Sequence, residues 1–520
     1  MRILMVVYDN GSYDHNFPMG LGAIAAILIK EGHEIEIWNQ DMHHWPDDYL
    51  RIYLDENKFD AVVISLIAGY YQYQKCKRLS KAINSSKQRP TYIIGGYGPT
   101  PEPEFFLRKM ECDIVALGEG EITAVKLFDA LANHKSLDTV PGIGFIDISG
   151  KFIETPRPPQ VEDLDSLPWY PYELFPMEYY RLVRFPEMGA TEFAMPMMSA
   201  RGCPFKCTFC YRMDPGYRKR DSELLLDEVE FLNKEYGIGY ISFQDDLLMS
   251  SVSHTEEVCR EFLKRKLPVN WDCNGRLNYC SPELLKLMKD AGCVYINYGI
   301  ESMDQKVLNT MKKGLNHNMI VNGIEWTLDV GINPGLNFIF GYPDDNKKTI
   351  KKSVDFLLKY DNQAEKRTIR PVTAYPGSPI YYDAIRLGLL DKDNPPEDFY
   401  EVKHLNSDLI STNFTKMDDD EFYECLDWAN KKLMKNYFDT QRDNTLAQIE
   451  YLYKTKDASF RGFRGMHDEA DKEKQETILR NWEGSKVSDG DRFASATASK
   501  IKKSESSGIK SAISPSRIIQ

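Results

Sequence analysis

Three cysteines within eight residues, Cys203, Cys207 and Cys210, constrain this chain more than any other feature. Their C-x-x-x-C-x-x-C spacing places three thiolates on one tight loop. A structural zinc site uses four protein ligands, and no Cys or His follows Cys210 at a short distance. Three thiolates suit a four-iron, four-sulfur cluster in which one iron stays open to a substrate or cofactor. Chance spacing of reduced cysteines, or a zinc site closed remotely by His254 or Cys259, are the alternatives.

Length and composition indicate a globular, soluble chain with more than one domain. Its 520 residues are 42% hydrophobic and 28% charged, which allows two or three separate cores. The net charge of −13, with no basic stretch in the folded part, argues against a nucleic-acid partner. Ten cysteines are too sparse for a disulfide framework. We find neither a signal peptide nor an apolar run long enough for a transmembrane segment, and therefore expect a cytoplasmic enzyme.

The first 145 residues alternate apolar runs with amphipathic segments. Five strands are expected, at Arg2–Val7, Glu34–Trp38, Ala61–Leu66, Tyr92–Ile94 and Ile114–Leu117. Four helices are expected, at Leu21–Lys30, Tyr71–Ile83, Glu102–Lys109 and Glu121–Ala132. This order predicts a parallel, doubly wound α/β sheet that binds its ligand beyond the carboxyl ends of the strands. Ser65 lies at one such end, and Gly95 and Gly96 at the next, where glycine permits a bulky ligand to approach the backbone.

The cysteine loop resembles the cluster loop of radical S-adenosylmethionine (SAM) enzymes, including the aromatic Phe209 before the last cysteine. The resemblance implies a [4Fe-4S] cluster whose open iron binds the amino and carboxylate groups of SAM. It also implies a partial TIM-type (β/α)6 barrel with cofactor-binding residues at its strand ends. Those residues are Asp245 and Asp246 for the methionine amino group, Arg276 for its carboxylate, and Glu301 for the ribose hydroxyls. Cys273, Cys280 and Cys293 are interpreted as small core residues.

The first segment resembles the flavodoxin-like cobalamin-binding domains that are fused to radical SAM enzymes. The resemblance rests on Ser65, Gly95 and Gly96, together with the segments Pro18–Ala25 and Ala116–Glu121. It implies that Ser65, Gly95 and Gly96 bind cobalamin. The Asp-x-His-x-x-Gly motif that supplies a cobalt-binding His is absent after the first strand. His43 and His44 follow the second strand and are interpreted as surface residues at a helix start. We therefore expect either cobalt without a protein His beneath it, or a domain that has lost cobalamin.

The remaining sequence completes a five-part organisation. We expect a cobalamin-binding domain at 1–145, a connector at 146–190, a radical SAM core at 191–400, a helical C-terminal region at 401–482 and a disordered tail at 483–520. The connector is Pro-rich between Thr155 and Tyr172, and the tail is rich in Ser and Lys. The barrel's first strand is expected at Met197–Ala200, and a C-terminal helix at Asp418–Lys435.

Together these resemblances imply methylation of an unactivated carbon. One SAM would yield a 5′-deoxyadenosyl radical that removes hydrogen from the substrate, and methylcobalamin, recharged by a second SAM, would supply the methyl group. The implied partners are a small-molecule or lipid substrate and an electron donor such as flavodoxin or ferredoxin. An oxidative cyclase or ring-rearranging enzyme of the anaerobic magnesium-protoporphyrin ester cyclase kind is the alternative. A degenerate corrinoid or iron–sulfur carrier is the non-enzyme alternative.

Overall fold

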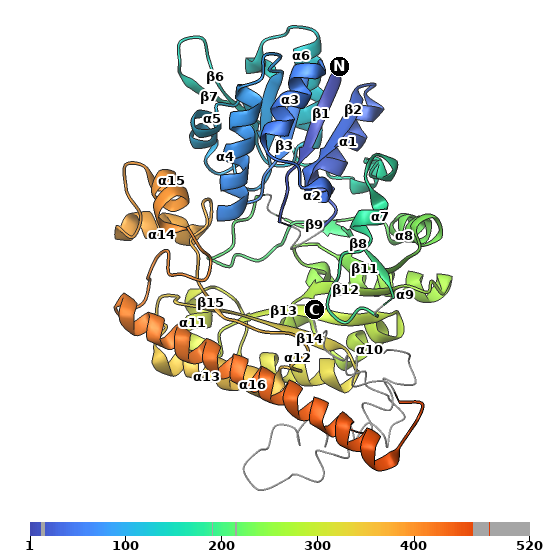
Figure 1. Cartoon of the computed structure of the whole chain (residues 1–520). Coiled ribbons are helices and arrows are strands. Elements are labelled where there is room, and N and C mark those ends of the chain that lie inside the picture. Colours follow the sequence, from blue (N-terminus) through green and yellow to red (C-terminus); the bar gives the residue numbers. More distant parts are fainter. Residues whose placement is uncertain (12–15, 190, 214–215, 461–477, 479–520) are drawn as a thin grey trace.

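The chain folds into two α/β units, one above the other, whose sheets direct their carboxyl ends toward the joint between them (Figure 1). The computed structural model describes residues 1–11, 16–189, 191–213, 216–460 and 478. The proposed tail at 483–520 and most of residues 461–482 lie outside the described residues. Among the described residues, no helix is long and apolar enough to cross a membrane.

The upper unit is a seven-stranded sheet in the order β2-β1-β3-β4-β5-β6-β7. The strands are β1 (Arg2–Val7), β2 (Glu34–Asn39), β3 (Ala61–Ser65), β4 (Thr91–Gly95), β5 (Ile114–Ala116), β6 (Ile143–Ile146) and β7 (Phe152–Glu154). The first five are parallel, as predicted, and their order 2-1-3-4-5 is that of flavodoxin-like sheets. Strands β6 and β7 are antiparallel additions that the sequence interpretation missed, and they carry the sheet to Glu154.

Helices cover both faces of this sheet, because its strands are apolar on both sides. The helices are α1 (Met19–Lys30), α2 (Gln40–His43), α3 (Asp48–Glu56), α4 (Tyr70–Asn84), α5 (Pro103–Met110) and α6 (Glu121–Ala132). Helices α1 and α6 pack side by side on one face, whereas α3, α4 and α5 line the other. The predicted doubly wound arrangement is therefore confirmed.

The lower unit is a six-stranded, entirely parallel half-barrel in the order β15-β14-β13-β12-β11-β8. Its strands are β8 (Phe193–Met197), β11 (Ile238–Phe243), β12 (Asn270–Gly275), β13 (Cys293–Glu301), β14 (Asn333–Phe340) and β15 (Arg370–Pro371). Helices α8 (Ser222–Tyr236), α9 (Val252–Arg265), α10 (Pro282–Asp290), α11 (Gln305–Thr310), α12 (His317–Asp329), α13 (Lys347–Tyr360) and α14 (Pro379–Leu387) follow the strands. The predicted (β/α)6 architecture is confirmed.

The expected first barrel strand at Met197–Ala200 was wrong. The barrel strand β8 ends at Met197, and Ala200–Arg201 forms a separate short strand, β9, that pairs antiparallel with β10 (Arg218–Lys219). The N–H groups of Ser199 and Ala200 donate to the Asp245 carboxylate, at 2.7 and 3.0 Å, instead of to a neighbouring strand. A continuous apolar run could not reveal this break, because a side-chain contact from another strand causes it.

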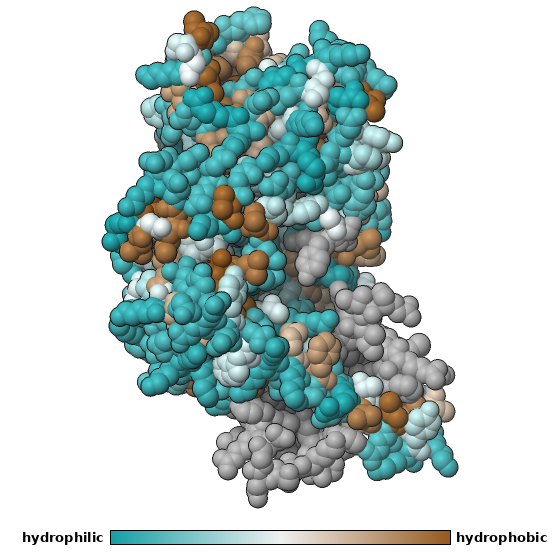
Figure 2. Space-filling model, turned by 60° about the vertical axis from the view of Figure 1, so that its left-hand side comes forward, coloured by the Kyte–Doolittle hydropathy of each residue, from teal (hydrophilic) through white to brown (hydrophobic). Residues whose placement is uncertain are grey.

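A long C-terminal helix, α16 (Asp419–Thr455, 37 residues), lies along the lower unit and packs against α13 (Figure 1). The helix predicted at Asp418–Lys435 is therefore present and continues well beyond that range. Its side chain Phe422 lies against Gly341, at the end of β14, where φ is +92°. The surface seen in Figure 2 is mostly hydrophilic, and its apolar side chains form small separate groups.

We predict that Gly341→Ala loosens the seat of α16 on the barrel. An added Cβ would overlap the Phe422 ring, and φ is in the left-handed region, so the two effects add to a loss of about 2–4 kcal/mol. Gly388→Ala is the matched control, since its φ is +72° but no atom lies within 4 Å of the added Cβ. Thermal unfolding should show a clearly larger drop for Gly341→Ala. Equal drops would mean that the Phe422 contact is unimportant.

Candidate cofactor and substrate site

The cysteine loop starts at Gly202, whose φ is +81°, and is fixed by backbone hydrogen bonds to the barrel. The Thr208 N–H donates to the Met311 carbonyl at 3.0 Å, and the Thr208 carbonyl accepts from Ile380 N–H at 3.0 Å. Two segments far apart in sequence thus hold the centre of the loop. The loop lies at the carboxyl end of the barrel and faces the upper unit.

The three loop thiols differ in exposure. Cys207 is buried, whereas Cys203 and Cys210 are half-buried. Burial raises the pKa of the Cys203 thiol and raises that of Cys210 to about 12. Iron must therefore displace protons from these thiols when it binds.

The alternative zinc site gains no support from the geometry. Among the described residues, no three Cys, His, Asp or Glu side chains converge as they would around a single ion. Nε2 of His254 lies 3.4 Å from Ser199 Oγ, and Cys259 is buried in the hydrophobic core behind the sheet. A four-iron cluster makes no such demand, because its thiolates bind separate iron corners.

Asp245 and Asp246, predicted as a pair, occupy different environments. Asp245 is buried and accepts hydrogen bonds from Ser199 N–H, Ala200 N–H and the Ser199 hydroxyl. Burial raises its pKa to about 7, although these hydrogen bonds oppose the shift. Asp246 is exposed, and its negative charge lies close enough to Cys203 to help raise the pKa of that thiol. The structure therefore uses Asp245 to hold the chain before the cluster loop, and leaves Asp246 open to a ligand.

Arg276, one residue beyond β12, is buried beside the cysteine loop. Its guanidinium lies 3.6 Å above the Phe205 ring, and Nη1 donates to Cys207 Sγ at 3.8 Å. Its Nε is buried without a hydrogen-bond partner, and no carboxylate of the described residues lies within 4.0 Å of the guanidinium. A buried cation with an unused donor fits a carboxylate-bearing ligand.

Glu301 ends β13 with a φ of +69°, a conformation that costs a non-glycine residue about 1–3 kcal/mol. Its carboxylate forms a buried ion pair with Lys313, at 2.9 Å. The pair lies over Gly299, where an added Cβ would overlap Glu301 and approach Lys313 Nζ to 2.8 Å. Lys313 also lies 5.6 Å from the centre of the Phe209 ring, so it belongs to the cluster environment. The sequence interpretation missed Lys313, because a Lys-Lys-Gly run looks like an exposed turn.

In the upper unit, Ser65, Gly95 and Gly96 meet at the carboxyl ends of β3 and β4. The φ of Gly96 is +102°, and an added Cβ would lie 2.7 Å from the Leu66 carbonyl oxygen and 3.1 Å from Ser65 Oγ. The two strand ends therefore pack backbone to backbone. This leaves a surface with few side chains, which fits the close approach of a large planar or extended cofactor.

His43 and His44 end helix α2, so their placement at a helix start was wrong. His43 stacks on the Trp45 ring, with centroids 4.2 Å apart. Nδ1 of His44 lies 3.2 Å from an Asp9 carboxylate oxygen, at the carboxyl ends of β2 and β1. That no protein His lies beneath the cobalt stays a prediction.

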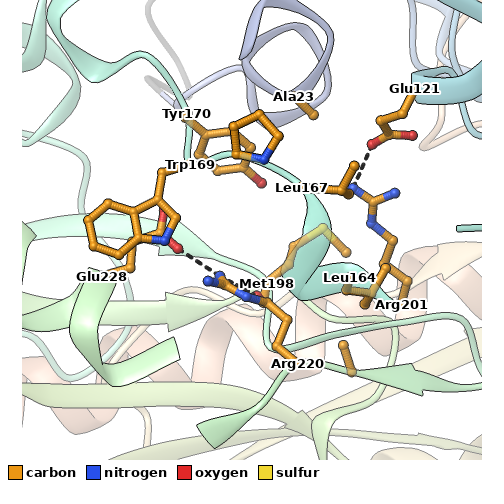
Figure 3. Close-up of a pocket in the computed structure, with 12 residues that line it drawn as sticks. Ala23, Glu121, Leu164, Leu167, Trp169, Tyr170, Met198, Arg201, Arg220 and Glu228 are labelled. Atoms are coloured by element: carbon orange, nitrogen blue, oxygen red, sulfur yellow. Dashed lines mark hydrogen bonds and ion pairs between the residues drawn. The ribbon is translucent and has the colours of Figure 1, made fainter. Parts of the chain in front are cut away.

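Ion pairs join the segment that carries the cysteines to the upper unit, and one of them, Arg201–Glu121, lines a small cavity of roughly 50 Å³ (Figure 3). Arg201, next to Gly202, pairs with Glu121 at 2.7 Å and Glu119 at 3.5 Å. Arg218 also donates to Glu119, at 2.9 Å. A space this small holds no cofactor, since ligand pockets measure roughly 300–1,000 Å³. The sequence interpretation quoted Glu119 and Glu121 only as parts of a motif, and their partners show that they anchor the loop.

Two family models match the chain in the same order as its two units. The B12 binding domain model matches residues 7–128, and the radical SAM superfamily model matches residues 197–357. The chain therefore has the two-domain architecture of cobalamin-dependent radical SAM enzymes. The three loop thiols would suit an iron–sulfur cluster, the buried Arg276 would suit the carboxylate of SAM, and the Gly96 surface would suit cobalamin.

Individual relatives share this architecture at low identity. An uncharacterised methyltransferase of Pyrococcus horikoshii is 27% identical over 76% of this chain and 85% of its own length. The cytidylyl-2-hydroxyethylphosphonate methyltransferase of Streptomyces wedmorensis is 28% identical over 75% of this chain and 81% of its own length. An anaerobic magnesium-protoporphyrin IX monomethyl ester cyclase of Rubrivivax gelatinosus is 26% identical over 68% of this chain and 65% of its own length. A hopanoid C-3 methylase of Methylococcus capsulatus is 25% identical over 71% of this chain and 69% of its own length.

A solved structure has the same fold. The radical SAM methyltransferase TsrM from Kitasatospora setae, with cobalamin and a [4Fe-4S] cluster bound, superposes with a TM-score of 0.61. The match has 17% sequence identity and covers 74% of this chain and 75% of that one.

We predict that replacing Cys203, Cys207 and Cys210 with Ala abolishes cluster binding. Anaerobically reconstituted wild-type protein should show the broad absorbance near about 400 nm of thiolate-ligated clusters, and the triple variant should lack both it and the iron. Cys425→Ala, in the buried face of α16, is the matched control and should keep its iron. Unchanged iron in the triple variant would contradict the assignment.

We predict that Arg276→Lys weakens SAM binding about tenfold, because lysine lacks the unused Nε donor and the planar fork. Equilibrium dialysis of labelled SAM against reconstituted protein measures this directly. Arg260→Lys, on an exposed i,i+4 pair with Glu256, should bind normally. Iron content should match wild type in both variants. Equal affinity for SAM in Arg276→Lys would remove the carboxylate-binding role.

Proposed function

We propose that this chain methylates an unactivated carbon of a small molecule, using SAM both as radical source and as methyl source. The supporting observation is that the cysteine loop and Arg276 lie at the end of the barrel that faces the Gly96 surface of the cobalamin-type unit. Arg201 and Glu119 tie these two sites together. One active space can therefore expose the substrate both to the adenosyl radical and to a methyl carrier.

The cofactors supply the chemistry that the side chains cannot: the cluster would pass an electron to SAM, and cobalamin would carry the methyl group. Arg276 binds the methionine carboxylate, and Asp246 accepts from the methionine amino group. Glu301, held by Lys313, accepts from the ribose hydroxyls. Ser65, Gly95 and Gly96 form the surface that binds cobalamin.

The overall reaction balances with two electrons. One substrate C–H bond and two SAM molecules give a C–CH₃ bond, methionine, 5′-deoxyadenosine and S-adenosylhomocysteine. The substrate hydrogen moves to 5′-deoxyadenosine. A soluble one-electron donor of the flavodoxin or ferredoxin kind would deliver both electrons in the cytoplasm. A cyclase, the second candidate because cyclases are among the relatives, would form 5′-deoxyadenosine and transfer no methyl group.

We predict that turnover yields 5′-deoxyadenosine and S-adenosylhomocysteine in about equal amounts. The small-molecule extract of cells that lack this gene is incubated with anaerobic holoenzyme, a reductant and SAM that carries a deuterated methyl group. A product heavier by one labelled methyl should appear. The triple cysteine variant, under the same conditions, should form no 5′-deoxyadenosine. Abundant 5′-deoxyadenosine with neither S-adenosylhomocysteine nor a labelled product would favour the cyclase.

A further inference from the structure

The two faces of the half-barrel sheet differ in polarity. On the outer face, apolar residues such as Phe243, Trp271 and Ile296 pack against the surrounding helices in the main core. The alternate residues, which face the interior, are polar or glycine on four neighbouring strands. They are Tyr240 and Ser242 of β11, Gln244 directly after β11, Asp272 and Asn274 of β12, Tyr295 and Asn297 of β13, and Gly335 and Asn337 of β14.

This polarity is unusual for a parallel sheet, because parallel strands are normally apolar on both faces. Polar groups that face inward must find partners, or their burial destabilises the fold. Asn337 and Gln244 are exposed, and Asn274, Tyr295 and Asn297 are half-buried, so the interior is not sealed. An open interior in which polar groups converge fits a ligand site better than a packing core, since it is such convergent polar groups that orient a bound ligand.

Three asparagines form a continuous amide ladder across the interior. Asn274 donates to the Asp245 carbonyl at 2.9 Å, and Asn297 donates to Asn274 Oδ1 at 3.1 Å. Asn337 donates to Asn297 Oδ1 at 2.6 Å. The ladder therefore starts beside the candidate SAM site and ends at an exposed amide.

Gly335 of β14 leaves room for the side chains of Tyr295 and Asn297, because it has no side chain of its own. An added Cβ would overlap Tyr295 Oη and lie 2.5 Å from Asn297 Oδ1. The polar ends of these two side chains therefore lie across β14 and into the interior. A larger residue at 335 would displace both of them.

The floor of the interior is also polar. Asp272 accepts from the Ser242 hydroxyl at 2.7 Å and lies 2.9 Å from Tyr240 Oη, and Gln244 donates to Ser242 at 2.6 Å. No Lys, Arg or His of the described residues lies within 4.0 Å of the Asp272 carboxylate. Burial raises the pKa of Asp272 to about 7. Tyr240 itself is fully buried, and its ring stacks on Phe185 with centroids 6.2 Å apart.

We propose that the half-barrel interior binds a polar, water-soluble substrate whose hydrogen-bonding groups pair with the amides of Asn337, Asn297 and Gln244. This proposal rests on the proposed function and narrows its substrate class. A hydrocarbon or sterol-like lipid would cover these amides without hydrogen bonds, at a cost of about 1–3 kcal/mol for each group. A substrate rich in hydroxyl or amide groups displaces the water bound to these amides and forms hydrogen bonds with them in its place.

The first test separates the two substrate classes. The extract of cells that lack the gene is divided into an aqueous and a chloroform-soluble fraction, and each is incubated with anaerobic holoenzyme, deuterated-methyl SAM and a reductant. We expect the labelled product in the aqueous fraction. A labelled product in the chloroform fraction would overturn the polar class and leave methylation intact. No labelled product in either fraction, from fully loaded enzyme, would count against the proposed function itself.

The second test asks whether the amide ladder contacts this substrate. Asn337→Leu removes the exposed end of the ladder. With the aqueous fraction as substrate and deuterated-methyl SAM, this variant should form about tenfold less labelled product when the extract is limiting. Product formation should return to the wild-type level when the extract is in excess. Asn322→Leu, exposed on the outer helix α12, is the matched control and should behave as wild type. Substrate-free cleavage of SAM should be the same in both variants. Loss of that cleavage in Asn337→Leu, or a normal response to limiting extract, would overturn the proposal.

Discussion

The position of the cluster loop depends on one largely buried cluster of charges, Glu119 with Arg201 and Arg218. Arg201 lies in β9 and Arg218 in β10, the short strands at the two ends of the segment that carries the three cysteines. Glu119 belongs to the upper unit, so its carboxylate holds both ends of that segment against a different domain. Removal of one partner of such a buried pair costs about 3–5 kcal/mol. The spacing between the two candidate cofactor sites therefore depends on this contact.

Most of the fold could be predicted from the sequence because its strands are short, apolar and separated by amphipathic helices. The five parallel strands of the upper unit, from β1 to β5, fall within two residues of their expected ends. The pattern failed at β8, where Asp245 captures two backbone N–H groups. It also missed β6 and β7, because short antiparallel strands give little periodic signal.

The candidate site was less accessible to sequence reasoning than the fold. The three cysteines and Arg276 could be found because they stand in a motif or at a strand end. Lys313 could not, since its burial depends on Glu301 and Gly299 from another segment. The distinction between Asp245 and Asp246 was equally hidden, because adjacent residues on a strand end face opposite environments. The polar interior depends on register: only the pairing of β11 to β14 shows that the alternate polar residues share one face.

Glu301 combines a strained backbone conformation with a buried ion pair. Glycine or asparagine would adopt its φ of +69° with less strain, so the backbone conformation by itself favours either one. Only a long carboxylate at this position reaches Lys313 Nζ. Loss of this glutamate would relieve about 1–3 kcal/mol of backbone strain but leave Lys313 buried without its carboxylate, at a cost of about 3–5 kcal/mol, so the strained backbone and the ion pair can only be kept or lost together.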